Sequence, residues 1–190
     1  MEKFIKYYVN NLTDLLNHID SKAIEQIKNV LDTTIEKKSK IYIIGNGGSS
    51  STASHMSNDL GVGLKLRSIR NFNVESLSDN NAVCTAIAND TGYENIFYTQ
   101  VKDKINKDDV LIAISCSGDS PNIVKAAKYA KEVGTTIVGA TGFGGGELKN
   151  LSDINFHIQT QKGQYGLVED MHMILDHIIF SYYISLKPTE

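Results

Sequence analysis

The chain has no tryptophan and only two prolines and two cysteines in 190 residues. Cys84 and Cys116 lie far apart and form no CxxC pair, which argues against a disulfide framework or a cysteine metal site and predicts a reducing, cytoplasmic setting. The sequence also lacks a proline-rich linker, a low-complexity tract and an internal repeat. We therefore expect residues 1–190 to form a single domain.

Long apolar runs and an excess of basic charge are missing as well. No segment approaches the roughly 18 consecutive apolar residues that span a bilayer, and the sequence after Met1 has no secretory pattern. The net charge is −3, from 19 basic and 22 acidic residues, and there is no basic stripe. We therefore expect no membrane insertion, no secretion and no nucleic-acid binding.

Short apolar runs alternate with helical patterns along most of the chain. Strands are predicted at residues 41–44, 72–77, 110–114, 136–140 and 154–158. Helices are predicted at about residues 51–60, 82–88, 96–105, 121–134 and 168–186. Five short apolar strands separated by helices predict an α/β fold with a doubly wound, five-stranded parallel sheet.

Two amphipathic helices are predicted before the first strand. Apolar residues recur at helical spacing over residues 4–19 and 24–35, and Asp20 and Ser21 between them are a helix-cap signal. These helices lie outside the strand–helix–strand alternation. Their apolar faces must therefore cover the sheet of this domain or a second subunit, and we expect a homo-oligomer.

Two loops with small residues follow predicted strands. Residues 45–49 read Gly-Asn-Gly-Gly-Ser and residues 115–120 read Ser-Cys-Ser-Gly-Asp-Ser, and a helical pattern follows each loop. In α/β proteins such strand–loop–helix junctions bind anions through backbone N–H groups. Because Ser50 replaces the last glycine of a GxGxxG motif and no Gly-Lys-Ser/Thr is present, neither nucleotide-binding motif is complete. We predict a site for a phosphorylated small molecule.

Four segments resemble the sugar isomerase (SIS) fold and, more narrowly, the bacterial phosphoheptose isomerases. These segments are residues 45–60, 86–97, 114–134 and 168–177. The resemblance covers almost the whole chain. It implies a homotetramer with sites at subunit interfaces, which converts sedoheptulose 7-phosphate into D-glycero-D-manno-heptose 7-phosphate for surface polysaccharide.

The resemblance also implies catalytic and metal-binding roles. Asp59 stands where the family has its catalytic glutamate, and His177 stands at the family's acid/base histidine. Moving a proton through an enediol requires such a base and acid. Some family members bind zinc at the positions of His55, Asp59, Glu169 and His177, and histidines with carboxylates suit a divalent metal. Helical spacing alone leaves Asp170 as an alternative to Glu169.

The substrate-binding candidates lie mainly in the two loops. They are Asn46, Gly47, Gly48, Ser49, Asp90, Ser115, Cys116, Ser117, Ser120 and Glu169. Of these, Asn46, Ser49 and Asp90 are the candidates for contacts with sugar hydroxyls. Among the remaining histidines, we expect His18 and His157 at the surface or in caps, and His172 as a supporting or interface group.

Several positions depart from the isomerase pattern. Asp59 is one methylene shorter than the usual glutamate, and Cys116 replaces a hydroxyl residue. Glu169 replaces a glutamine and adds a negative charge that a cation or a proton must offset, which strengthens the case for a metal. A further departure is Gly63, at a position where relatives often carry an arginine. Lys65 and Arg67 are the candidates to take over the role of that arginine.

These departures leave the exact sugar phosphate open, because a fold does not fix a substrate. Arabinose-phosphate isomerases of the same fold usually have a lysine in the first glycine loop, which is absent here. Two non-catalytic alternatives are a sugar-phosphate sensor and a partner of a replication initiator. The latter type lacks the carboxylate and histidine pair, so Asp59 and His177 favour an enzyme.

Overall fold

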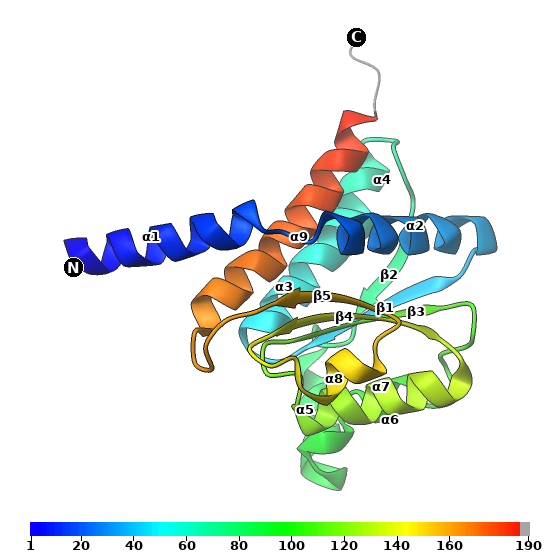
Figure 1. Cartoon of the computed structure of the whole chain (residues 1–190). Helices are drawn as coiled ribbons and strands as arrows, with labels where there is room; N and C mark the ends of the chain where they lie inside the picture. Colours follow the sequence, from blue (N-terminus) through cyan, green and yellow to red (C-terminus); the bar gives the residue numbers. More distant parts are fainter. Residues whose placement is uncertain (187–190) are drawn as a thin grey trace.

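The computed structural model describes residues 1–186 and has an α/β fold. Its centre is a five-stranded sheet in the order β2-β1-β3-β4-β5, and every neighbouring pair of strands is parallel (Figure 1). The strands are β1 (Lys40–Gly45), β2 (Asn73–Ser76), β3 (Val110–Ser115), β4 (Thr136–Gly142) and β5 (Ile154–Ile158). The predicted five-stranded parallel sheet is therefore confirmed.

Helices cover both faces of the sheet and form two separate cores (Figure 1). One core lies under α2 (Ser21–Lys37), α3 (Gly48–Asn58) and α9 (Tyr165–Ser185). The other lies under α5 (Asn81–Thr91), α6 (Tyr98–Val101), α7 (Pro121–Val133) and α8 (Gly146–Leu151). Within residues 1–186 no helix is both long enough and apolar enough to cross a membrane. Because helices pack on both faces of the sheet, the loops at the strand ends are held by a rigid scaffold.

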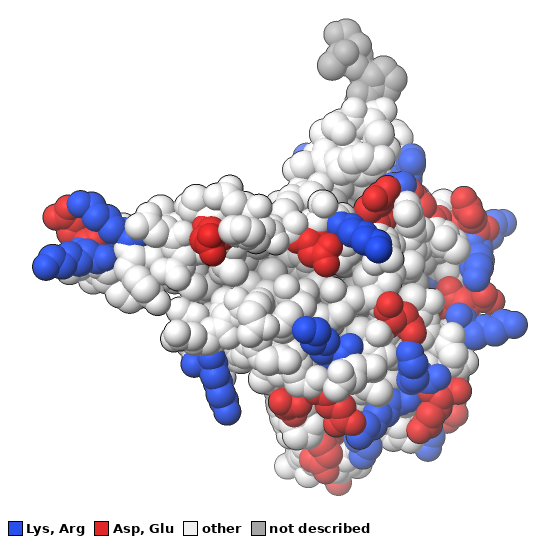
Figure 2. All heavy atoms as spheres, in the orientation of Figure 1, with Lys and Arg blue, Asp and Glu red and all other residues white. Residues whose placement is uncertain are grey.

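Helix α1 (Glu2–Asn17) buries none of its residues, unlike the long helices α2, α7 and α9. It projects away from the sheet and meets the rest of the chain mainly at α9 (Figure 1). At that contact Tyr8 Oη donates a hydrogen bond of 2.6 Å to Asp170 Oδ2. Phe4, Ile5 and Val9 remain exposed, and Figure 2 shows mostly uncharged atoms along the visible face of this helix. Leu12 and Leu15 pack against the core, whereas Phe4, Ile5 and Val9 stay more than half exposed within residues 1–186.

Local sequence signals set several helix ends. Asp20 caps α2, because its side chain accepts a hydrogen bond of 2.9 Å from Ala23 N. Pro121 opens α7, and Gly134 ends it in the left-handed conformation at a φ of 83°. The two predicted N-terminal helices and the predicted helix 121–134 are thereby confirmed.

Other helices differ from the prediction. The predicted helix 96–105 is wrong in length: α6 covers only Tyr98–Val101, because Tyr93–Asn95 forms a 3₁₀ turn before it and Asp103 has a positive φ of 58° after it. Helix α3 starts at Gly48 and widens into a π-helical turn at Asp59–Gly63, before the short α4 (Leu64–Leu66). Helix α8 was not predicted.

Candidate active site

The two small-residue loops meet where β1 and β3 lie side by side. The chain leaves β1 for β2 on one side and returns to β3 on the other, so this junction is the switch point of the sheet. A cavity of about 170 Å³ opens there. Its lining residues are Asn46, Ser49, Ile114, Ser115, Cys116, Ser117, Ser120 and Tyr165. We call this space the serine-loop cavity. The structure thus brings predicted binding residues of both loops into one place.

The serine-loop cavity suits an anion without holding a basic side chain. Helix α3 begins at Gly48 and α7 begins just after Ser120, so two helix N-termini border the same space. Helix N-termini carry partial positive charge and unpaired N–H groups. Ser115, Ser117 and Ser120 add hydroxyls, and Ser115 Oγ already accepts a bond of 3.1 Å from Gly118 N. Dipoles and hydroxyls can therefore hold a phosphate here.

The serine loop (residues 115–120) packs backbone to backbone against the glycine-rich loop after β4 (residues 143–146). Gly118 has a φ of 70°, and a Cβ there would clash with the backbone oxygen of Gly145. Two hydrogen bonds tie the same loops together, from Leu148 N to Gly118 O at 2.9 Å and from Gly142 N to Cys116 O at 3.0 Å. The shape of the cavity is therefore set by close contact between two chain segments.

Cys116 lines this cavity, and Glu169 lies near Cys116. Burial, with a contribution from the nearby Glu169, raises the pKa of the Cys116 thiol to about 11. The thiol is therefore protonated at neutral pH and is a weak donor. Glu169, on α9, presses its carboxylate against Gly48, where an added Cβ would clash with it. Glu169 therefore neighbours the glycine loop.

A second group of side chains forms where α3 and α9 pack together. His55 Nε2 lies 3.2 Å from His177 Nε2 and 3.5 Å from Asp59 Oδ2. Asp176 completes the group, since its Oδ2 lies 3.9 Å from His55 Nε2. One ligand atom from each of these four residues lies within 4.8 Å of the others. We call this group the His/Asp cluster; among the predicted metal ligands it contains all except Glu169.

The donor set of the His/Asp cluster fits a divalent metal. Zinc bonds of 2.0–2.2 Å in a tetrahedron place neighbouring ligand atoms about 3.4 Å apart, close to the separations of 3.2 and 3.5 Å that His55 Nε2 makes. Two imidazoles and two carboxylates also match the ligand preferences of zinc. The cluster can therefore hold a metal ion.

Asp176 is the functional candidate that the sequence analysis missed. Its side chain is fully buried, and burial beside Asp59 raises its pKa to about 7. The available signal was an acidic residue on the apolar stripe of α9, between the buried His172 and Ile179. Recognising it required knowing which face of α9 meets α3.

Three other predicted residues take different places. Asp90 is exposed on α5 and accepts a bond from Asn89, outside both sites. Asp170, the alternative to Glu169, accepts from Tyr8 and is not part of the cluster. His172 is 1% exposed, its Nε2 lies 3.3 Å from Thr141 O, and burial lowers its pKa to about 4. It is a buried, neutral group that links α9 to the end of β4.

The Asn46 side chain is held by contacts that the sequence did not suggest. Its Oδ1 accepts from Asn122 Nδ2 at 2.8 Å and from Tyr93 Oη at 3.0 Å. Asn122 is 1% exposed on the first turn of α7. The two loops are therefore joined by an amide pair beside the serine-loop cavity.

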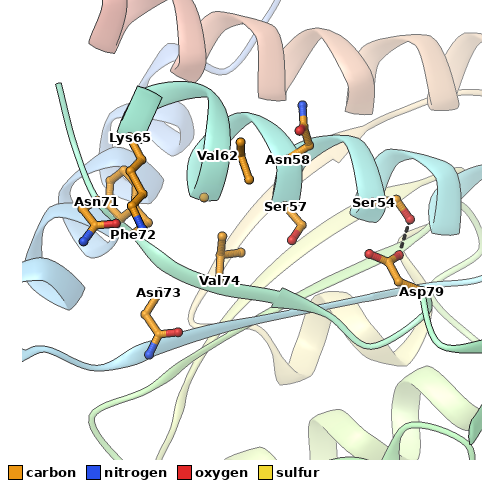
Figure 3. Close-up of a pocket in the computed structure, with 11 residues that line it drawn as sticks. Ser54, Ser57, Asn58, Val62, Lys65, Asn71, Phe72, Asn73, Val74 and Asp79 are labelled. Carbon is orange, nitrogen blue, oxygen red and sulfur yellow. Dashed lines mark hydrogen bonds between the residues drawn. The ribbon is translucent and has the colours of Figure 1, made fainter. Parts of the chain in front are cut away.

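A larger cavity, of about 540 Å³, lies between α3, the π-helical turn and the edge strand β2 (Figure 3). Ser54, which donates a hydrogen bond to Asp79, and Lys65 lie at its border. Lys65 thus lines a space other than the serine-loop cavity. Arg67 is turned to α9, where its guanidinium stacks on Phe180. Neither cation takes part in the serine-loop cavity.

Comparisons with known proteins identify the family of this chain. Residues 7–142 match the family described as SIS domain. A phosphoheptose isomerase of Helicobacter pylori strain P12 is 39% identical over 158 residues, which cover 83% of this chain and 81% of that protein.

Two solved structures share the fold over nearly their whole length. A phosphoheptose isomerase from Francisella tularensis has a TM-score of 0.85 at 25% identity, covering 96% of this chain and 95% of that one. The phosphoheptose isomerase of Neisseria gonorrhoeae has a TM-score of 0.87 at 23% identity, covering 97% and 99%, and supports the fold. The chain belongs to the SIS domain family and, within it, to the phosphoheptose isomerases.

Proposed function

We propose that the protein interconverts sedoheptulose 7-phosphate and D-glycero-D-manno-heptose 7-phosphate. One observation carries the proposal: the anion-binding cavity and the His/Asp cluster lie along the same helix, α9. Glu169 lies against Gly48 of the glycine loop and His177 belongs to the cluster, and the helical rise separates these residues by about 12 Å. An extended sugar phosphate of seven carbons can bridge such a separation, with its phosphate in the cavity and its carbonyl end at the cluster.

The reaction moves a proton between C1 and C2 of the sugar through an enediol. In this proposal the Asp59 carboxylate accepts the carbon-bound proton and returns it to the neighbouring carbon. The His177 ring exchanges a proton with the carbonyl oxygen. Both groups lie beside His55. A divalent metal such as zinc, held by the cluster, would polarise the carbonyl and stabilise the negative charge of the enediolate.

Binding of the phosphate falls to the serine loop. Ser115, Ser117 and Ser120 offer hydroxyls, and the N-termini of α3 and α7 offer N–H groups and dipoles. Asn46, with its side chain fixed by Asn122, is placed to contact a sugar hydroxyl. We infer that the product is used to make surface polysaccharide. We also infer that the protein works in the cytoplasm, a reducing compartment in which its two cysteines stay free.

The decisive experiment supplies sedoheptulose 7-phosphate to the purified protein and follows the aldose product by NMR. We expect turnover that rises with added zinc and falls with a chelator, and none with unphosphorylated sedoheptulose. Tight binding of the sugar phosphate with no isomerisation of any ketose phosphate would instead support a sensor.

Assembly into a homotetramer with sites at subunit interfaces is also part of the proposal. Its support is α1, which buries no residue and exposes Phe4, Ile5 and Val9. Replacing Ile5 and Val9 together by Lys should shift the sedimentation coefficient towards smaller species. Asn10→Lys, at another exposed position of α1, is the matched control. A monomeric unsubstituted protein would contradict this assembly.

A further inference from the structure

Asp176 is a buried carboxylate that no hydrogen bond satisfies. Its side chain has no exposed area, and neither carboxylate oxygen has a hydrogen-bond partner within residues 1–186. A buried charge without a partner is strongly disfavoured, so such a carboxylate requires either a proton or a cation. The side chains that face it are His55 from α3, Asp59 from the π-helical turn and its neighbour His177. No Lys or Arg of the described residues forms an ion pair with it.

The contacts of Asp176 direct it into the His/Asp cluster. Its Oδ2 lies 3.9 Å from the ring nitrogen of His55, and that nitrogen also faces His177 and Asp59. A divalent cation among these four groups would meet two neutral imidazoles and two carboxylates, whose charges would balance its own. The same cation would satisfy the unpaired oxygens of Asp176.

Glu169 has a different environment although it lies on the same helix face. Asp176 lies seven positions after Glu169, which is almost two full helical turns and about 10 Å along α9. At its own level Glu169 meets Gly48 and influences Cys116, both at the serine-loop cavity. The helix therefore presents one carboxylate to each of the two regions.

We propose that Asp176 is a ligand of the divalent metal and takes the position that the family resemblance gives to Glu169. This proposal rests on the metal site of the proposed function and deepens it. Glu169 is then free to face the substrate near the serine-loop cavity. The ligand set becomes His55, Asp59, Asp176 and His177, a combination suited to zinc.

The first experiment compares Asp176→Asn with the matched control Glu169→Gln. Each variant replaces a carboxylate on α9 by its amide of similar shape. Zinc affinity of the metal-free proteins is measured by competition with a chromogenic chelator. We expect Asp176→Asn to weaken zinc binding by about 100-fold or more, because loss of an outer-sphere partner alone costs 10–100-fold. Glu169→Gln should leave the affinity within about threefold of the unsubstituted protein.

The second experiment reads the ligand directly and does not depend on affinity. Asp176→Cys and Glu169→Cys are prepared under reducing conditions and loaded with Co²⁺, which replaces zinc as a spectroscopic probe. A thiolate bound to Co²⁺ gives a near-ultraviolet charge-transfer band. We expect this band in Asp176→Cys and its absence in Glu169→Cys and in the unsubstituted protein, which shares Cys84 and Cys116. Circular dichroism of the metal-free proteins checks that each variant is folded.

The outcomes separate this proposal from the proposed function. Unchanged zinc affinity in Asp176→Asn, or a charge-transfer band from Glu169→Cys instead of Asp176→Cys, would overturn the role of Asp176. Isomerase activity of the unsubstituted protein would still support the function in that case. Conversely, the expected metal results with no isomerisation of any ketose phosphate would support the site and contradict the function. An unsubstituted protein that takes up no zinc overturns the metal site itself.

Discussion

The serine-loop cavity and the His/Asp cluster serve the same proposed reaction but are built in different ways. The cavity uses uncharged and mostly small residues, nearly all from two short loops, and its polarity comes from hydroxyls and helix ends. The cluster uses four titratable side chains from two distant parts of the chain, and His55 and His177 are 122 positions apart. Binding of the anion therefore depends on local backbone geometry, whereas the chemistry depends on how α3 packs against α9.

The largest expected effect separates the two regions. His177→Ala removes the proposed acid/base group and should lower kcat by about 10²–10⁴-fold, the range for such catalysis. Affinity for inorganic phosphate should stay within about threefold, because the serine-loop cavity does not include His177. NMR turnover assays and phosphate titration measure the two quantities.

His18→Ala is the control for that experiment, since His18 is exposed at the end of α1. It should change neither quantity. Full turnover in His177→Ala would remove the cluster from the mechanism and break the proposed division of labour.

The next effect concerns pH and the buried His172, which lies on the same helix as His177. Burial lowers the His172 pKa from 6.5 to about 4, so between these values the unfolded chain binds a proton that the folded chain does not. The free energy of unfolding therefore falls as the pH drops below 6.5, by about 2 kcal/mol at pH 5 from this group alone. Above pH 6.5 its contribution is fully present.

Urea unfolding at pH 7.5 and pH 5 measures this effect by comparison with His172→Gln. The variant lacks the titrating ring, so its loss of stability between the two pH values should be smaller by about that amount. Equal losses in both proteins would show that His172 takes up a proton as readily in the folded state as in the unfolded state.

The smallest effect belongs to the serine loop. Ser117→Ala and Ser120→Ala should each weaken a phosphorylated ligand by about 1–2 kcal/mol, which is typical of one hydrogen bond to a charged group. The kcat at saturating substrate should change little, because neither serine belongs to the His/Asp cluster. Calorimetric titration with sedoheptulose 7-phosphate measures the loss. Equal affinity for the unphosphorylated sugar would contradict the assignment of this cavity to phosphate.

The regularity of the sheet made much of the fold predictable. Each strand is a short apolar run, and the caps at Asp20 and Gly134 depend only on neighbouring residues. The irregular parts were not predictable in this way. The π-helical turn at Asp59–Gly63 has no periodic signal of its own, and α6 is shortened by the turns around it. Such features depend on tertiary packing more than on local propensity.

The candidate site also has one part with a local sequence signal and another part that depends on tertiary packing. The contiguous loops made the serine-loop cavity visible in the sequence, and the i, i+4 spacing of His55 and Asp59 placed them on one helix face. Asp176 gave no comparable signal, because its burial results from the contact between α3 and α9. The family resemblance pointed to Glu169 because it transfers positions in the sequence and carries no information about which carboxylate this chain turns towards the histidines.

The backbone contact between Gly118 and the glycine-rich loop after β4 has a kinetic consequence. Two segments whose backbones touch directly have little room to move, so neither can change its conformation alone. The phosphate site is thus preformed in the free protein, and little conformational entropy is lost when the phosphate binds. We expect the association rate of the phosphorylated ligand to depend on how often it collides with the site in the right orientation. No slow conformational change of the loops should follow the collision.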